Sequence, residues 1–184
     1  MKKLLIATAI AAASVTPQAF AQAKNFEGFS VLGALNVNNN KVEGVNAVNT
    51  TESNVALQAE YGLPLGESFV LGLGASFGLN DITVAADAKL KSMNSFYITP
   101  GVAVSKDVLV YGKIAAISAK LDTTVGSADM SGVGYGFGAR YFASKGLFFQ
   151  GEYVFNQYDD KNVTAAIKAK NQTGVLSIGV GYKF

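Results

Sequence analysis

The chain has 184 residues and a formal net charge of +2, and it contains no cysteine, no histidine and no tryptophan. Without cysteine and histidine, the commonest zinc ligands and any Ser–His–Asp arrangement are missing, so the sequence predicts no metal site, no cofactor and no histidine-dependent enzyme. The small charge gives no electrostatic reason to expect a nucleic-acid partner.

The first 21 residues have the features of a secretory signal peptide. Lys2 and Lys3 precede an apolar stretch over residues 4–15, and Ala19-Phe20-Ala21 fits a cleavage site. The alternative is an uncleaved anchor, but the apolar stretch is shorter than the roughly 20 residues that a spanning helix needs. We therefore expect cleavage after Ala21 and one mature domain over residues 22–184. Without Lys2 and Lys3, thirteen of the fifteen basic residues remain and balance thirteen acidic ones.

Along the mature chain, eight segments alternate between apolar residues and small or polar ones. This period of two predicts strands with one apolar face each. The segments cover residues 29–37, 55–63, 69–79, 96–104, 108–116, 133–141, 147–155 and 174–184. Pro100 lies within the fourth segment, where it cannot donate a backbone hydrogen bond, so we expect a local bulge there.

Long and short connections alternate strictly between these strands. The short ones are 64–67, 105–107 and 143–146, and the long ones are 38–54, 80–94, 119–131 and 156–171. This alternation is typical of an up-and-down barrel that crosses a membrane. In lipid such a sheet must close so that every backbone group is paired. The sequence therefore predicts an all-β fold, an eight-stranded antiparallel up-and-down transmembrane β-barrel with both mature ends on the tight-turn side.

The aromatic residues of the apolar faces fall into two groups by height along the strands. A soluble β-protein is the alternative to a membrane barrel. In water, however, the apolar faces of these strands would together form an exposed apolar area far larger than the patches that soluble monomers expose. Two aromatic girdles are expected at membrane interfaces, although aromatic residues also favour strands in general. The tight-turn group is Phe29, Tyr61, Phe69, Tyr141, Phe149, Tyr182 and Phe184, and the loop-side group is Phe77, Phe96, Tyr135 and Phe155.

The C-terminal run alternates up to a terminal aromatic residue. Its apolar positions are Leu176, Ile178, Val180, Tyr182 and Phe184. This run resembles the C-terminal signal of bacterial outer-membrane β-barrels. "LVYGKIAAI" and "GVGYGFGARYF" look like the fifth and sixth strands of OmpA/OmpX-like and opacity-type porin-family barrels. The resemblance implies an outer-membrane location in contact with lipid and lipopolysaccharide, and recognition of this last strand by the barrel-assembly machinery.

Four charged residues fall on the inward phase of the predicted strands: Glu60, Lys113, Arg140 and Glu152. Two carboxylates could suggest acid–base catalysis. An eight-stranded barrel, however, is only wide enough for its own side chains, and a buried charge must be paired. We therefore interpret the four residues as a neutral plug. The glycines of "GVGYGFG" recur at every second position of a strand, so they do not form a phosphate-binding loop.

Three classes of function remain open. The first is a non-enzymatic barrel that serves surface contact, adhesion or envelope integrity. The second is a narrow porin-like channel, and the third is a lipid-modifying enzyme. The absence of histidine disfavours the enzyme and the strand number disfavours the pore. The sequence thus favours the first class, a monomer whose loops could contact host or surface ligands through residues 38–54, 80–94, 119–131 and 156–171.

Overall fold

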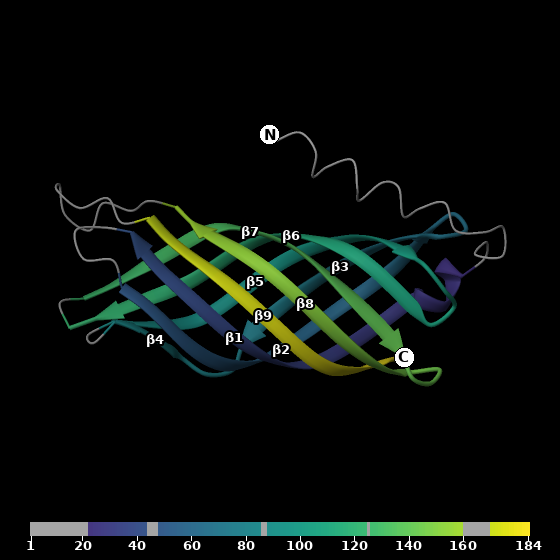
Figure 1. Ribbon diagram of the computed structural model, residues 1–184, viewed down its shortest axis with the longest axis horizontal. Helices are drawn as coiled ribbons and strands as arrows, with labels where there is room; N and C mark the ends of the chain where they lie inside the picture. Colours follow the sequence, from purple (N-terminus) through teal and green to yellow (C-terminus); the bar gives the residue numbers. More distant parts are fainter. Residues whose placement is uncertain (1–21, 44–47, 86–87, 125, 160–169) are drawn as a thin grey trace.

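The computed structural model describes residues 22–43, 48–85, 88–124, 126–159 and 170–184, which form a closed barrel of antiparallel strands (Figure 1). A short 3₁₀ turn precedes the strands. The elements are η2 (Ala23–Phe26), β1 (Gly28–Glu43), β2 (Val48–Leu65), β3 (Phe69–Gly78), β4 (Ile82–Ala85), β5 (Ala88–Ala103), β6 (Val108–Thr123), β7 (Gly126–Phe142), β8 (Leu147–Tyr158) and β9 (Lys170–Lys183). No helix of these residues is long and apolar enough to cross a membrane.

The strand order shows how the sheet closes. The order is β3-β2-β1-β9-β8-β7-β6-β5-β4, and β3 also pairs with β5. All strands except the four-residue β4 therefore form one ring of eight, and the predicted eight-stranded up-and-down barrel is confirmed. The first and last strands pair from Ser30 with Lys183 to Glu43 with Lys170. Beyond this ladder the backbone N–H of Phe184 donates to the carbonyl of Phe29 at 2.9 Å.

The strands are longer than the sequence predicted, and they extend into each of the predicted long connections. Strands β1 and β2, for example, pair as far as Val42 with Val48, inside the predicted connection 38–54. Polar side chains continue the pairing there, because the Asn38 amide donates to the Asn54 side chain at 2.8 Å. The sequence prediction followed the apolar face, which ends where lipid contact ends, whereas backbone pairing continues into polar residues. Residues 44–47, 86–87, 125 and 160–169 of these connections lie outside the described part of the chain.

The bulge predicted at Pro100 is wrong. Pro100 faces outward and lies opposite Leu71 of β3 in an unbroken register, and the β5–β6 register is the same before and after it. The register shift of β5 lies between Lys91 and Asn94 instead, where Ser92 has a φ of 48°. In an antiparallel sheet each residue directs its backbone groups to one neighbour. A proline therefore removes a single hydrogen bond and needs no inserted residue.

The two faces of the barrel wall differ in polarity. Thirty large apolar side chains of the described residues are exposed, and they lie on the outer face. The inner face carries mainly alanine, glycine and polar residues, with large apolar side chains gathered near the tight turns, because alternate side chains of a strand point to opposite sides. Figure 1 shows η2, the tight turns and the C-terminus at one end, on the right, and β4 at the other end. We call these the tight-turn end and the long-hairpin end.

Candidate functional site

The four inward charges form two ion pairs inside the barrel, and we call them the charge layer. The ammonium of Lys113 in β6 lies 2.8 Å from Glu152 Oε1 in β8. The guanidinium of Arg140 in β7 lies 3.0 Å from Glu60 Oε1 in β2. None of the four side chains is more than 7% exposed. The charge layer therefore holds two positive and two negative groups that cancel inside the lumen.

Neutral side chains form further hydrogen bonds with the charged groups of the charge layer. The hydroxyl of Tyr111 donates to Glu152 Oε2 at 3.0 Å, and the hydroxyl of Thr99 donates to Glu60 Oε2 at 3.2 Å. Arg140 also donates two hydrogen bonds to Gln150 Oε1, at 3.0 and 2.8 Å. A buried ion pair offsets its loss of hydration only when further hydrogen bonds of this kind are present.

Glycines on the inner face make room for these side chains. A Cβ atom at Gly72 would overlap the Thr99 hydroxyl and crowd the Glu60 carboxylate. A Cβ atom at Gly138 would overlap the Tyr111 hydroxyl. Gly138, the last glycine of "GVGYGFG", is therefore required by packing inside the barrel.

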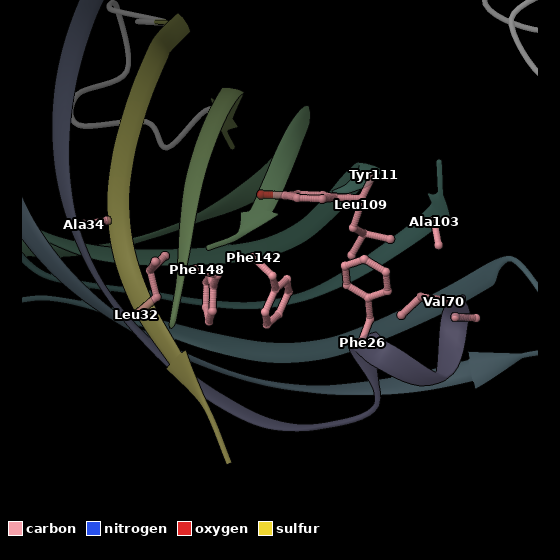
Figure 2. Close-up of a cluster of buried hydrophobic side chains, with 10 residues drawn as sticks. Phe26, Leu32, Ala34, Val70, Ala103, Leu109, Tyr111, Phe142 and Phe148 are labelled. Atoms are coloured by element: carbon pink, nitrogen blue, oxygen red, sulfur yellow. The ribbon is translucent and has the colours of Figure 1, made fainter. Parts of the chain in front are cut away.

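A cluster of buried, mainly apolar side chains packs inside the tight-turn end of the lumen (Figure 2). Its three phenylalanines are Phe26 of η2, Phe142 of β7 and Phe148 of β8, and we call these three the apolar layer; Tyr111 of β6 borders them on the side of the charge layer. The Phe26 and Phe142 rings meet edge to face at 5.3 Å between centroids, and the Phe142 and Phe148 rings are 5.1 Å apart. The guanidinium of Arg140 lies 4.6 Å from the centre of the Phe148 ring. The apolar layer and the charge layer are thus in direct contact.

Hydrogen bonds hold the turn that carries Phe26 across the tight-turn end. The backbone N–H groups of Gln22 and Ala23 donate to the carbonyl of Glu67 at 3.0 and 3.1 Å. The Asn25 side chain donates to the carbonyl of Lys106 at 3.2 Å. A Cβ atom at Gly62 would overlap the carbonyl oxygen of Phe26. The segment is therefore tied to the β2–β3 and β5–β6 turns and fits closely against the inner wall.

The sequence analysis missed the apolar layer, although one signal for it was present. Phe142 and Phe148 occupy the inward phase of strands whose other inward residues are mainly small or polar. Two large inward rings on neighbouring strands at the same end predict a filled lumen there. Phe26 could not be assigned in this way, because it precedes the first strand and its position depends on how η2 folds back.

The residues predicted for assembly lie on β9 at the closing seam of the barrel. Leu176, Ile178, Val180, Tyr182 and Phe184 are all exposed on the outer face. The Phe184 ring packs on Tyr182 at 5.2 Å and on Phe29 of β1 at 6.2 Å.

Among the described residues, no group of three or more His, Cys, Asp or Glu side chains could hold a metal ion.

Comparison with protein families assigns the chain. The model described as "Outer membrane protein beta-barrel domain" matches residues 5–184. The chain belongs to this family. It is therefore an outer-membrane barrel, and the exposed apolar face of its strands is the surface that contacts membrane lipid. A comparison with curated protein sequences finds no match.

Solved structures of small outer-membrane barrels are similar to this one in fold. Ail, the attachment invasion locus protein of Yersinia pestis, is 16% identical over 86% of this chain and 99% of its own, with a TM-score of 0.57. Neisserial surface protein A is 18% identical over 86% of this chain and 98% of its own, with a TM-score of 0.61. Ail has also been solved with the heparin analogue sucrose octasulfate, with 15% identity, the same 86% and 99% coverage and a TM-score of 0.51. Identities this low establish the shared fold alone.

Proposed function

We propose that this outer-membrane barrel is a non-enzymatic, non-conducting monomer that acts through its wall and its cell-surface end, in surface contact, adhesion or envelope integrity. The observation that supports this proposal is the filling of the lumen by the charge layer and the apolar layer in series. A barrel without an open path through it leaves its outer wall and its ends for function.

The alternative of a narrow channel would require both layers to open. Breaking a buried ion pair costs about 3–5 kcal/mol because a charge is left without its partner. A passing solute would also have to displace the ring of Phe26, which is 2% exposed. Neither layer contains the continuous polar, water-filled route that porins provide.

The alternative of a lipid-modifying enzyme is disfavoured by the positions of the interior acids. Glu60 and Glu152 point into the lumen, and each is already engaged by a cation and a hydroxyl group. A lipid lies outside the wall and cannot reach them. The chain also contains no histidine that could act as a general base.

The proposal includes the route to the membrane and the orientation. We propose removal of residues 1–21 by signal peptidase, recognition of the last strand by the barrel-assembly machinery, and both mature termini in the periplasm. The long-hairpin end would then face the exterior and contact host or surface ligands. Lys91 and Asp122 are examples of charged groups there, and their side chains form an ion pair at 2.6 Å. Ail has been solved with a sulfated sugar, so sulfated glycans are a sensible first probe.

Conductance measurement in planar bilayers tests the sealed lumen. The wild-type monomer should show no steady channels. A variant with both layers weakened, Phe26→Ser combined with Lys113→Ser, should show openings, which verifies that inserted protein is being measured. Stable porin-sized conductance from the wild type would contradict the proposal.

Trimming of the long-hairpin end tests the surface role. Replacement of residues 119–131 by a short turn should leave the barrel folded, as judged by gel mobility before and after heating. Binding to sulfated glycans or host cells, or resistance of the envelope to detergent, should fall in cells that carry the trimmed protein. If trimming each of the four connections left all of these properties unchanged, the surface role would be wrong.

A further inference from the structure

A cavity of about 100 Å³ lies inside the barrel on the long-hairpin side of the charge layer. The Lys113–Glu152 ion pair lines it on the tight-turn side. This volume is several times the roughly 10–15 Å³ that a cavity needs to hold one water molecule, so the cavity has room for a small solute.

One part of the cavity lining consists of amides and hydroxyls held in place by each other. Asn38 donates to the Asn54 side chain at 2.8 Å, and the hydroxyl of Ser177 donates to Asn36 Oδ1 at 2.6 Å. These bonds join β1 to β2 on one side and to β9 on the other. The groups are therefore fixed before any ligand arrives, which lowers the entropy cost of binding.

Apolar side chains supply another part of the lining. Ile82 of β4 and Leu90 of β5 are 2% and 1% exposed, and Met93 and Ile117 extend the same surface. Ile82 and Leu90 belong to an apolar cluster at the long-hairpin end. The cavity therefore offers hydrogen-bonding groups and hydrocarbon together.

One polar atom of the lining is buried without a partner. Among the residues that the structure describes, no group donates to Asn156 Oδ1 of β8, although the atom is shielded from outside solvent. Gly134 of β7 leaves space for this side chain, because a Cβ atom there would lie 2.5 Å from Asn156 Oδ1. A buried acceptor without a donor costs about 1–3 kcal/mol. A donor from a bound molecule would remove that cost.

We infer that this cavity binds a small uncharged polyol of about three or four carbons. The hydroxyls would pair with Asn156 Oδ1 and the fixed amides, and the C–H groups would contact Ile82 and Leu90. The ligand is uncharged because Lys113 and Glu152 already neutralise each other, so a charged ligand would find no free counter-charge. The size follows from the volume of the cavity.

Methyl NMR of the full chain in lipid nanodiscs tests the inference, with glycerol and erythritol as probes. The methyl signals of Ile82, Ile117 and Met93 should shift saturably with either polyol. Glycerate, which is similar in size but charged, should produce no saturable shift. Asn156→Leu should weaken binding about tenfold, the effect expected when one buried hydrogen bond is lost.

Two further variants keep the result interpretable. Asn39→Leu makes the same substitution on the exposed outer face of β1 and should leave polyol binding unchanged. Ser76→Leu fills the cavity from β3 without altering Asn156 and should abolish binding, which covers the case that Asn156→Leu fails to fold. The inference is overturned by non-saturable shifts in the wild type, by equal affinity in Asn156→Leu or Ser76→Leu, or by equal binding of glycerate. Methyl–water cross-peaks that no polyol diminishes would show a water-filled cavity and would also overturn it.

Discussion

Replacement of Lys113 by methionine should strongly destabilise the barrel, because it leaves Glu152 buried with only the Tyr111 hydroxyl as partner. Methionine keeps most of the side-chain volume and removes the charge. Removing one partner of a buried ion pair costs about 3–5 kcal/mol of stability. The lost contact between the Lys113 ammonium and the Tyr97 ring, 3.9 Å from its centroid, adds about 0.5–2 kcal/mol.

The double variant Lys113→Met with Glu152→Gln should recover most of this loss. It removes both charges, and the glutamine carbonyl can still accept the hydrogen bond from Tyr111. Replacement of a buried ion pair by uncharged groups is often neutral or stabilising. The remaining cost should therefore be about 1–2 kcal/mol, mainly from the contact with the Tyr97 ring.

The assay is urea unfolding of refolded protein in detergent micelles, with the folded fraction read from gel mobility without heating and extrapolated linearly to water. The chain contains no tryptophan, so tryptophan fluorescence cannot be used to follow unfolding. Lys145→Met, in the exposed β7–β8 turn, is the matched control and should change stability by less than about 0.5 kcal/mol. The reasoning is refuted if Lys113→Met costs less than about 1 kcal/mol, or if the double variant is as unstable as Lys113→Met.

Three further predictions concern assembly, orientation and the long-hairpin end. Deletion of Phe184 should lower the amount of assembled protein in cells and leave refolding in detergent intact, because only assembly in cells needs recognition of the last strand. If the deletion variant assembled in cells with wild-type yield, Phe184 would contribute only through packing, worth about 1.5–3 kcal/mol. A cysteine placed at Thr51 should react with an impermeant reagent on intact cells, and one at Gly66 should not; the reverse result would invert the proposed orientation. The hydrogen bond and charge of Lys91 hold the pKa of Asp122 below its usual range. Lys91→Met should therefore raise the titration midpoint of Asp122 in carboxyl NMR, and any stability from this pair, present at neutral pH, should be lost as the pH falls through the pKa of Asp122 in the folded protein; an unchanged midpoint would show that the pair is not formed in solution.

Most of the barrel wall could be predicted from the sequence because the alternation of a strand is a local property. Every second residue faces lipid, so Phe29, Tyr61 and Phe149 were assigned to the outer face without any knowledge of pairing. The same alternation along each strand placed Glu60 and Arg140 on the inner face. The requirement that a sheet in lipid has no free edge then implied closure.

The contacts within the lumen were decided only by the tertiary structure. Alternation predicts that a side chain points inward, but the register of several strands determines which acid meets which base, so the pairing of Lys113 with Glu152 across β6 and β8 could not be read from spacing. The position of Phe26 depends on η2 folding back across the tight-turn end and on hydrogen bonds to two turns distant in sequence. The cavity beside Asn156 likewise arises where inward side chains of most strands leave space between them. Local chemistry determines which way each residue faces, and only the closed barrel determines what it meets there.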